Sequence, residues 1–190
     1  MFTRATSLVH HMLRAHVREG DHVLDATCGN GYDTELLASL VGAKGRVVGM
    51  DIQEEAIAAT RTRLVEAGLV DRCSLHCMSH AFVGDVLEEG TGLACAVFNL
   101  GYLPGSDKSV ITRPQSSRRA HEAVIDRLSP GGVVFTTMYT GHEGGQDEAE
   151  GLLAWSRQLP PTHFSVARHE WINQNGHPPS ILVITRRAKR

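Results

Sequence analysis

The chain has 190 residues, a length typical of a single domain. Its 19 lysines and arginines against 21 aspartates and glutamates give a formal net charge of −2. This excludes polybasic attraction as the main source of any nucleic-acid affinity, although it does not exclude RNA as a shaped substrate. A hydrophobic content of 42% and a charged content of 21% are typical of a globular domain that folds without disulfide or metal staples. We expect residues 1–190 to form one domain, with residues 1–20 as a helical extension.

The cysteines and the N-terminal segment indicate the cellular compartment. The four cysteines contain no C-x-x-C pair, and we interpret them as reduced core thiols of a cytosolic protein: Cys28, Cys73, Cys77 and Cys95. The N-terminus lacks the apolar segment of about 7–15 residues that marks a signal peptide. No apolar stretch approaches the length of a membrane span. The sequence thus predicts a cytoplasmic protein with no metal site and no membrane association.

Strand-like and helix-like segments alternate along the chain after a first amphipathic helix at residues 6–18. Strands are expected at 22–25, 45–50, 73–77, 94–100, 133–138, 164–171 and 181–185, and helices at 33–41, 53–67, 80–87, 116–128 and 146–158. Apolar strands that are each followed by a helix predict a parallel sheet covered on both faces. The short connection between the last two strands predicts an antiparallel pair at one edge. The expected fold class is α/β and Rossmann-like, with a seven-stranded, mostly parallel sheet that has one antiparallel edge strand.

A glycine-containing loop follows the first expected strand. Gly29 and Gly31 lie between Asp25, at the end of that strand, and the next helix, and glycines there allow a positive φ and close backbone approach to a ligand. Asp51 ends the second strand, 20 residues after Gly31. A carboxylate at that place accepts hydrogen bonds from both hydroxyls of an adenosine ribose. The two signals together predict an adenosine-containing cofactor.

The acidic residues around this loop favour S-adenosyl-L-methionine over NAD. A dinucleotide fingerprint has glycine or alanine where this chain has Thr34. Asp25 and Asp33 suit the ammonium of S-adenosyl-L-methionine but repel a pyrophosphate. Two alternatives stay open, because Asp33 also fits a helix N-terminus and Asp25 also fits a carboxylate that braces the loop without touching a ligand.

A second loop begins where the fourth strand ends, at Asn99. Its side-chain oxygen and a neighbouring backbone carbonyl can accept hydrogen bonds from one amine and orient its lone pair toward a methyl donor. The loop is similar to the Asn-Pro-Pro-Tyr loop of amino-methyltransferases, with Leu-Gly in place of Pro-Pro. Tyr102 is placed to stack on a base, or alternatively to pack as a lid on the loop prolines.

Several strings together resemble one family closely: DATCGNGYDT, GMDIQ, Ser79-His80, NLGYLPGSDK followed by Thr112 and Pro114, YTGHEGG, and NQNGHPPS. They are similar to the small bacterial methyltransferases labelled rRNA methylases (the YtqB-like family). The strings extend from residue 25 to residue 180, which is nearly the whole chain. The neighbours of the Ser-His pair, Met78 and Ala81, depart from the acidic residue that the family often has there.

This resemblance implies a class I, S-adenosyl-L-methionine-dependent methyltransferase with no separate RNA-binding domain. It implies conversion of 5-aminomethyl-2-thiouridine to 5-methylaminomethyl-2-thiouridine at the wobble position of tRNA. It also implies cofactor contacts at Asn30, Asp51, Gln53, Ser79, His80 and Asn99, to which the loop analysis adds Asp25, Gly29, Gly31 and Asp33.

The amine must lose a proton before it can attack a methyl group, because an alkylammonium has a pKa of about 10. The candidate acceptors are Asp107, His142 and solvent, so the candidate catalytic set is Asn99, Tyr102, Asp107 and His142. Each acid or base also has a structural alternative, as the brace of an Asx turn for Asp107 and as a cap of loop carbonyls for His142.

Since the net charge is −2, contacts with a tRNA anticodon stem-loop must come from a local surface. The candidates in and after the second loop are Tyr102, Lys108, Thr112, Arg113, Arg118 and Arg119. Arg4, Arg14 and the basic tail from residue 186 are further candidates, with a solvated surface as the alternative reading.

Other functions remain compatible with the sequence alone. One is methylation of rRNA or of a small amine; the others are an NAD-binding oxidoreductase and a noncatalytic protein that binds S-adenosyl-L-methionine or RNA. The chain is expected to be a monomer or a homodimer.

Overall fold

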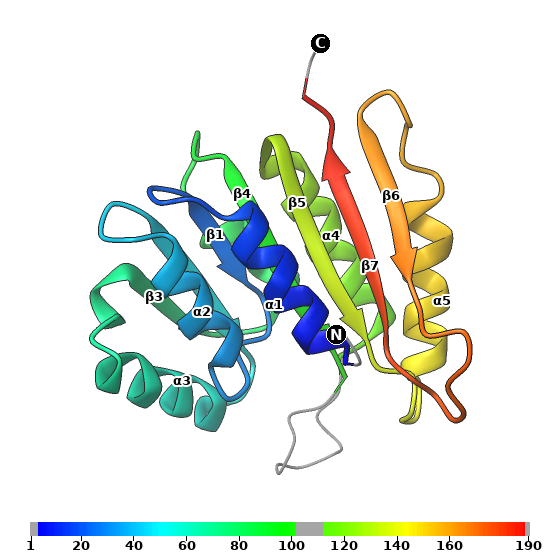
Figure 1. Cartoon of the computed structure of the whole chain (residues 1–190), viewed down its shortest axis with the longest axis horizontal. Helices are drawn as coiled ribbons and strands as arrows, with labels where there is room; N and C mark the ends of the chain where they lie inside the picture. Colours follow the sequence, from blue (N-terminus) through cyan, green and yellow to red (C-terminus); the bar gives the residue numbers. More distant parts are fainter. Residues whose placement is uncertain (1–3, 102–111, 189–190) are drawn as a thin grey trace.

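The computed structural model describes residues 4–101 and 112–188. Seven strands form one sheet in the order β3-β2-β1-β4-β5-β7-β6 (Figure 1). Their bounds are Cys73–Cys77 for β3, Arg46–Asp51 for β2, His22–Asp25 for β1, Leu93–Leu100 for β4, Leu128–Met138 for β5, Ser180–Arg186 for β7 and Phe164–His169 for β6. All neighbouring pairs from β3 to β5 are parallel, whereas β7 is antiparallel to both β5 and β6. The strand order reverses between β1 and β4, which is where ligands bind in open α/β sheets.

Helices cover both faces of this sheet (Figure 1). One face carries α1 (Ala5–His16), α2 (Tyr32–Leu40) and α3 (Glu54–Glu66), and the other carries α4 (Pro114–Arg127), α5 (Gly145–Ser156) and the short 3-10 helix η2 (His80–Asp85). A second 3-10 turn, η1, spans Val70–Arg72. No helix among the described residues is long and apolar enough to cross a bilayer.

Strand β4 shows how the sheet serves two separate cores. Ala96 and Phe98 pack with the α4 and α5 side, while Cys95 and Val97 pack with α1 and α2. All four are completely buried. A central strand buried on both faces reads as a continuous apolar run, which is why this segment is apolar until Asn99.

The expected elements are confirmed, with shifts of a few residues at most boundaries. The antiparallel pair at one edge is also confirmed, although the reversed strand β7 lies one place inside the edge strand β6. β5 begins at Leu128 rather than at residue 133, because Leu128 already pairs with Leu93 before a register shift. The expectation of four core thiols is wrong for Cys77, whose position at the end of edge strand β3 leaves it exposed.

Gly31 allows the loop after β1 to lie directly against α3. Its φ is +80°, and an added Cβ would stand 2.8 Å from the backbone Cα of Thr60. The Thr60 hydroxyl also donates to the carbonyl of Gly29, whose own φ is +53°. The positive φ values expected from the sequence are therefore present, and Gly31 is needed for packing as well.

We predict that Gly31→Ala lowers the free energy of unfolding by about 2–5 kcal/mol, because it combines left-handed backbone strain with overpacking against a rigid helix. Gly68→Ala is the matched control. Gly68 also has a positive φ, of +68°, but an added Cβ there meets nothing within 4 Å. Its expected cost is only the strain, about 1–2 kcal/mol. Equal losses for the two variants in urea denaturation would contradict the packing role of Gly31.

Candidate active site at the carboxyl edge of the sheet

Asp51, the last residue of β2, holds the glycine loop in place. Its Oδ2 accepts the Gly29 N–H at 2.9 Å, and its Oδ1 accepts the Gln53 N–H at 3.0 Å. Asp51 is only partly buried, and each carboxylate oxygen has a second lone pair to offer. The exposed side chain of Ile52 follows directly, with 60% of its surface accessible. This edge therefore presents a carboxylate beside an apolar surface.

Asp25 lies inside the loop rather than on its surface. It is completely buried, and its two oxygens accept the Thr27 N–H at 3.2 Å and the Thr34 hydroxyl at 2.6 Å. Burial, followed by the charge of Asp33, raises the pKa of Asp25 to about 7. Two roles were expected for Asp25, contact with a ligand and bracing of the loop. The geometry favours bracing of the loop.

A chain of three side chains connects α1 to the end of β4. His10 Nε2 lies 2.5 Å from Asp33 Oδ1, and Asn99 Nδ2 donates to Asp33 Oδ2 at 2.7 Å. The backbone N–H of Asn99 donates to the Thr27 hydroxyl at 2.7 Å. Asp33 lies in the first turn of α2, but the N-cap is Gly31 and makes no side-chain cap bond. Asp33 therefore organises the site and does not cap its helix.

Two residues after β5 complete this side of the edge. A Cβ on Gly101 would lie 3.4 Å from Tyr139 and 3.7 Å from the His142 ring, so both side chains border the first residue after β4. Burial, and secondarily the charge of Asp33, raise the pKa of Tyr139, which keeps its hydroxyl protonated. His142, expected as a proton acceptor, thus stands beside the start of the loop that follows Asn99.

A buried glutamate ties the far end of that loop to the helices. Glu148 of α5 accepts the Thr112 hydroxyl at 2.6 Å and the Ser117 hydroxyl at 2.5 Å, although it is only 2% exposed. The Thr112 N–H donates to the Gly101 carbonyl at 3.1 Å, so the loop starts and ends at one place. The hydroxyl of Thr112, expected to bind substrate, is therefore engaged within the protein.

The Ser79-His80 pair begins η2 next to β2. The Ser79 hydroxyl accepts the Ala81 N–H at 3.3 Å as the cap of that turn. His80 is buried, with Nε2 3.4 Å from the Ser117 hydroxyl, and burial lowers its pKa to about 4. His80 is therefore neutral at physiological pH and contacts α4 from beneath the surface.

The expected basic residues lie on or beside α4. Arg113 precedes the helix and is exposed. Arg118 forms an ion pair with Glu122 at 2.8 Å, and the Arg119 guanidinium lies 5.0 Å from the centre of the exposed Phe82 ring. Arg113 and Arg119 thus have more freedom to meet an anionic partner than Arg118 has.

The structure brings together most of the residues expected from the sequence. Asn99, Asp33, the glycine loop with Asn30, Asp51 and Gln53 all lie at the carboxyl ends of β1, β2 and β4. Tyr102, Asp107 and Lys108 lie outside the described residues. Sequence analysis missed His10, Thr27, Tyr139 and Glu148. Of these, Thr27 and Tyr139 stood in strings that had been singled out, DATCGNGYDT and YTGHEGG.

Comparison with known proteins identifies the family. The family model described as "Putative rRNA methylase" matches residues 47–185, and that of the ubiE/COQ5 methyltransferase family matches residues 8–85. The first match covers more than half of the chain. The chain belongs to the rRNA methylase family. It is thus a methyltransferase of the Rossmann-like class.

The similarity to individual relatives extends along nearly the whole chain. A protein of Arabidopsis thaliana named chloroplastic tRNA (mnm(5)s(2)U34)-methyltransferase is 34% identical over 191 residues, which is 96% of this chain and 70% of the relative. The structure of a putative rRNA methylase from Clostridium thermocellum is 37% identical, with a TM-score of 0.94 over 98% of this chain and 99% of the other. A putative methyltransferase from Streptococcus mutans in complex with SAH is 30% identical, with a TM-score of 0.87 over 98% and 99% of the two chains.

The methyl donor of this methyltransferase is S-adenosyl-L-methionine, which decides against the NAD-binding oxidoreductase. The described residues fit such a cofactor. A partly exposed carboxylate (Asp51), an exposed apolar neighbour (Ile52) and a glycine loop with two positive φ values meet at one edge. Among residues 4–101 and 112–188, no group of three or more His, Cys, Asp or Glu side chains is placed to hold a metal ion.

We predict that the stability conferred by Asp25 depends on pH with a definite sign. Between its ordinary pKa of 3.8 and its folded pKa of about 7, the folded state keeps a proton that the unfolded chain releases. Stability from this group is therefore full below the ordinary pKa and decreases as the pH rises toward the folded pKa. The free energy of unfolding of Asp25→Asn, relative to that of the wild type, should therefore increase by about 1.4 kcal/mol per pH unit between about pH 5 and pH 6.5. Above about pH 7.5 this difference should become constant.

Denaturation in urea at each pH measures this difference. The matched control is Asp126→Asn, which changes an exposed carboxyl on α4. A difference between Asp25→Asn and the wild type that stays constant from about pH 5 to pH 8 would contradict a protonated, buried Asp25.

Proposed function

We propose that this enzyme transfers a methyl group from S-adenosyl-L-methionine to the primary amine of 5-aminomethyl-2-thiouridine at the wobble position of tRNA. The observation that carries the proposal is the side chain of Asn99. Its Nδ2 is held by Asp33, so its carbonyl oxygen is left on the other side of the planar amide as an acceptor for an amine. The name of the Arabidopsis relative supports the same substrate.

In this proposal the residues of β1, β2 and the following loops bind the cofactor. The partly exposed Asp51 accepts the ribose hydroxyls, the exposed Ile52 contacts the adenine, and the loop of Gly29, Asn30 and Gly31 surrounds the methionine portion. Gln53, Ser79 and His80 complete the adenosine side. The cofactor supplies an activated methyl group on its sulfonium, so the protein has mainly to position the nucleophile.

The amine must be neutral when it attacks. Asn99 Oδ1 accepts one of its hydrogens and thereby aims the lone pair, while closeness to a cation and removal from water lower the pKa of the amine. The proposed acceptor of the proton is the ring of His142, which lies beside Gly101. Asp107 and solvent remain the other acceptors proposed, and Tyr102 remains the proposed stacking residue.

The anticodon stem-loop is proposed to lie along the start of α4. The exposed Arg113 and Arg119, with Arg118 and Lys108, contribute the phosphate contacts, which gives a local basic rim on a protein of net charge −2. Such a rim provides salt-dependent affinity without a dedicated RNA-binding domain. Cytoplasmic location and a monomeric or dimeric state are proposed along with it.

We predict that Asp51→Ala weakens binding of S-adenosylhomocysteine by more than about tenfold, because it removes a charged acceptor worth about 1.5–3 kcal/mol. It also frees the Gly29 and Gln53 N–H groups. Titration calorimetry measures the affinity, with Asp126→Ala as the control. Unchanged affinity in a variant with a normal circular dichroism spectrum would contradict the ribose assignment.

We predict that Arg113→Gln together with Arg119→Gln raises the KM for tRNA severalfold and flattens its salt dependence, since each phosphate contact contributes about one unit to the salt slope. Affinity for S-adenosylhomocysteine should not change. Arg157→Gln, an exposed arginine just after α5, is the control. If KM has the same dependence on salt in all three proteins, the RNA binds elsewhere.

The proposed function is tested with purified enzyme, labelled S-adenosyl-L-methionine and tRNA carrying 5-aminomethyl-2-thiouridine. Nucleoside mass spectrometry should detect 5-methylaminomethyl-2-thiouridine with the wild type, and about 100-fold less in a single turnover with Asn99→Ala. Parallel reactions contain ribosomal RNA and small primary amines. Methylation of one of these, with none of the tRNA, would replace the proposed substrate while leaving the enzyme class unchanged.

A further inference from the structure

We propose that His10, on the N-terminal helix α1, is a positioning residue for methyl transfer: through Asp33 it fixes the side-chain amide of Asn99 with the carbonyl oxygen available to the substrate amine. The inference rests on the proposed function, in which Asn99 receives that amine. It gives α1 a role in the reaction in addition to its role in packing.

The contacts form a continuous path with normal donors and acceptors. His10 Nε2 to Asp33 Oδ1 is 2.5 Å, and Asn99 Nδ2 to Asp33 Oδ2 is 2.7 Å. Each oxygen of the carboxylate therefore serves one partner. The side chains of His10 and Asp33 are only 26% and 12% exposed, so water competes little for these bonds.

The charge of Asp33 decides which way the Asn99 amide faces. An amide offers donors at one end and acceptors at the other, and the two orientations have nearly the same shape. An ionised carboxylate only accepts hydrogen bonds, so it binds the NH2 end and leaves the oxygen for the substrate. The opposite orientation would present two donors to an amine that must also donate. A bond from His10 holds the carboxylate in the rotation at which its second oxygen meets Asn99.

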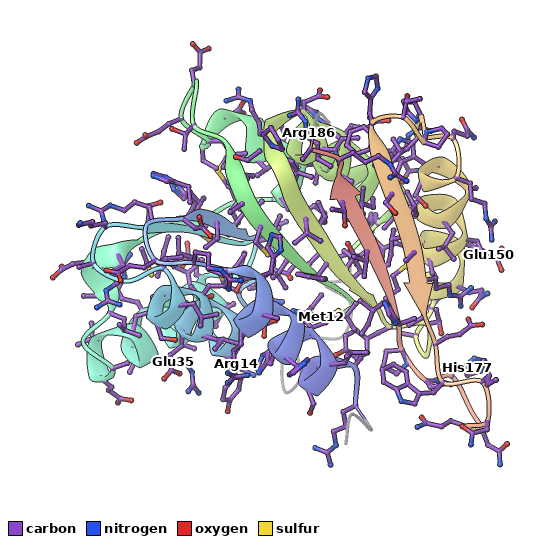
Figure 2. The ribbon with its side chains drawn as sticks, turned by 45° about the horizontal axis from the view of Figure 1, so that its top comes forward. Met12, Arg14, Glu35, Glu150, His177 and Arg186 are labelled. Carbon is purple, nitrogen blue, oxygen red and sulfur yellow. The ribbon has the colours of Figure 1, made fainter. Side chains whose placement is uncertain are left out.

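The packing of α1 explains why His10 reaches this place. Ala5, Val9 and Leu13 recur every four residues, are buried, and attach the helix to the core that contains α2. Figures 1 and 2 show α1 lying across the front of the sheet beside α2, with Arg14 and Glu35 on the same side of the molecule. His10 follows Val9 directly and projects from the buried stripe toward the first turn of α2, where Asp33 lies.

His16 provides a matched control on the same helix. Its ring is also partly buried and hydrogen-bonded, with Nε2 3.0 Å from the Ala94 carbonyl, and it packs edge-on against Phe135. Within residues 4–101 and 112–188, these contacts of His16 are to Ala94 and Phe135 and not to Asp33 or Asn99. Loss of either ring removes a comparable packing contact, but only loss of the His10 ring removes a hydrogen bond to Asp33.

Single-turnover rates on tRNA carrying 5-aminomethyl-2-thiouridine test the inference. His10→Ala should lower the rate by about 30–100-fold, with affinity for S-adenosylhomocysteine and KM for tRNA within about threefold of the wild type. His10→Gln, which retains a side-chain N–H donor, should recover most of the rate, and His16→Ala should leave the rate unchanged. In an Asn99→Ala background, His10→Ala should have no further effect, because both changes remove the same interaction.

A second measurement does not depend on the substrate. In nitrogen-15 NMR spectra, the Asn99 side-chain amide, assigned by its loss in Asn99→Ala, should be protected from exchange in the wild type and in His16→Ala but not in His10→Ala. If the wild type methylates a different substrate and these spectra hold, the positioning role stands and the proposed substrate is wrong. Three results would each overturn the inference. The first is a single-turnover rate of His10→Ala within about twofold of the wild type, and the second is a double variant in which the rate losses of His10→Ala and Asn99→Ala multiply. The third is an Asn99 side-chain amide that stays protected from exchange in His10→Ala.

Discussion

The two hydrogen bonds of the Asp33 carboxylate are the interactions on which the arrangement of the candidate active site depends. The carboxylate joins α1, α2 and β4 through His10, its own helix and Asn99. The same charge helps raise the pKa of the buried Asp25 and of Tyr139. The raised pKa keeps the Tyr139 hydroxyl protonated and lets the buried Asp25 keep its proton in mildly acidic solution. One ionised group thus orders a site that contains side chains from three separate elements.

Three aspartates near the reversal of strand order have different roles because their environments differ. Asp51 is partly exposed and keeps lone pairs for a ligand, Asp33 lies between protein donors, and Asp25 is fully buried and braces the loop. Burial penalises the charged form, so the pKa of the innermost carboxyl, Asp25, is raised. In the proposed function, the same residue type therefore serves in binding, in orientation and in loop structure within one edge of the sheet.

The fold could be predicted from the sequence because the buried parallel strands are continuous apolar runs that end at polar residues. The run that stops at Asn99 and the spacing from Gly31 to Asp51 predicted that the candidate site lies at this edge of the sheet. What sequence could not provide were pairings between distant segments. His10 to Asp33 and Ser117 to Glu148 join residues 23 and 31 positions apart, and no local pattern marks either contact. The complete burial of Asp25 was likewise invisible, because it depends on how Thr34 and the loop close over the carboxylate.

The central claim is that Asn99, held through Asp33, receives the amine that accepts the methyl group. A crystal structure of the enzyme with S-adenosylhomocysteine and an anticodon stem-loop bearing 5-aminomethyl-2-thiouridine tests it most directly. The account predicts the amine nitrogen about 3 Å from Asn99 Oδ1, with Asn99 Nδ2 still bonded to Asp33. An amine held by other groups, or an Asn99 amide turned with its oxygen toward Asp33, would contradict it.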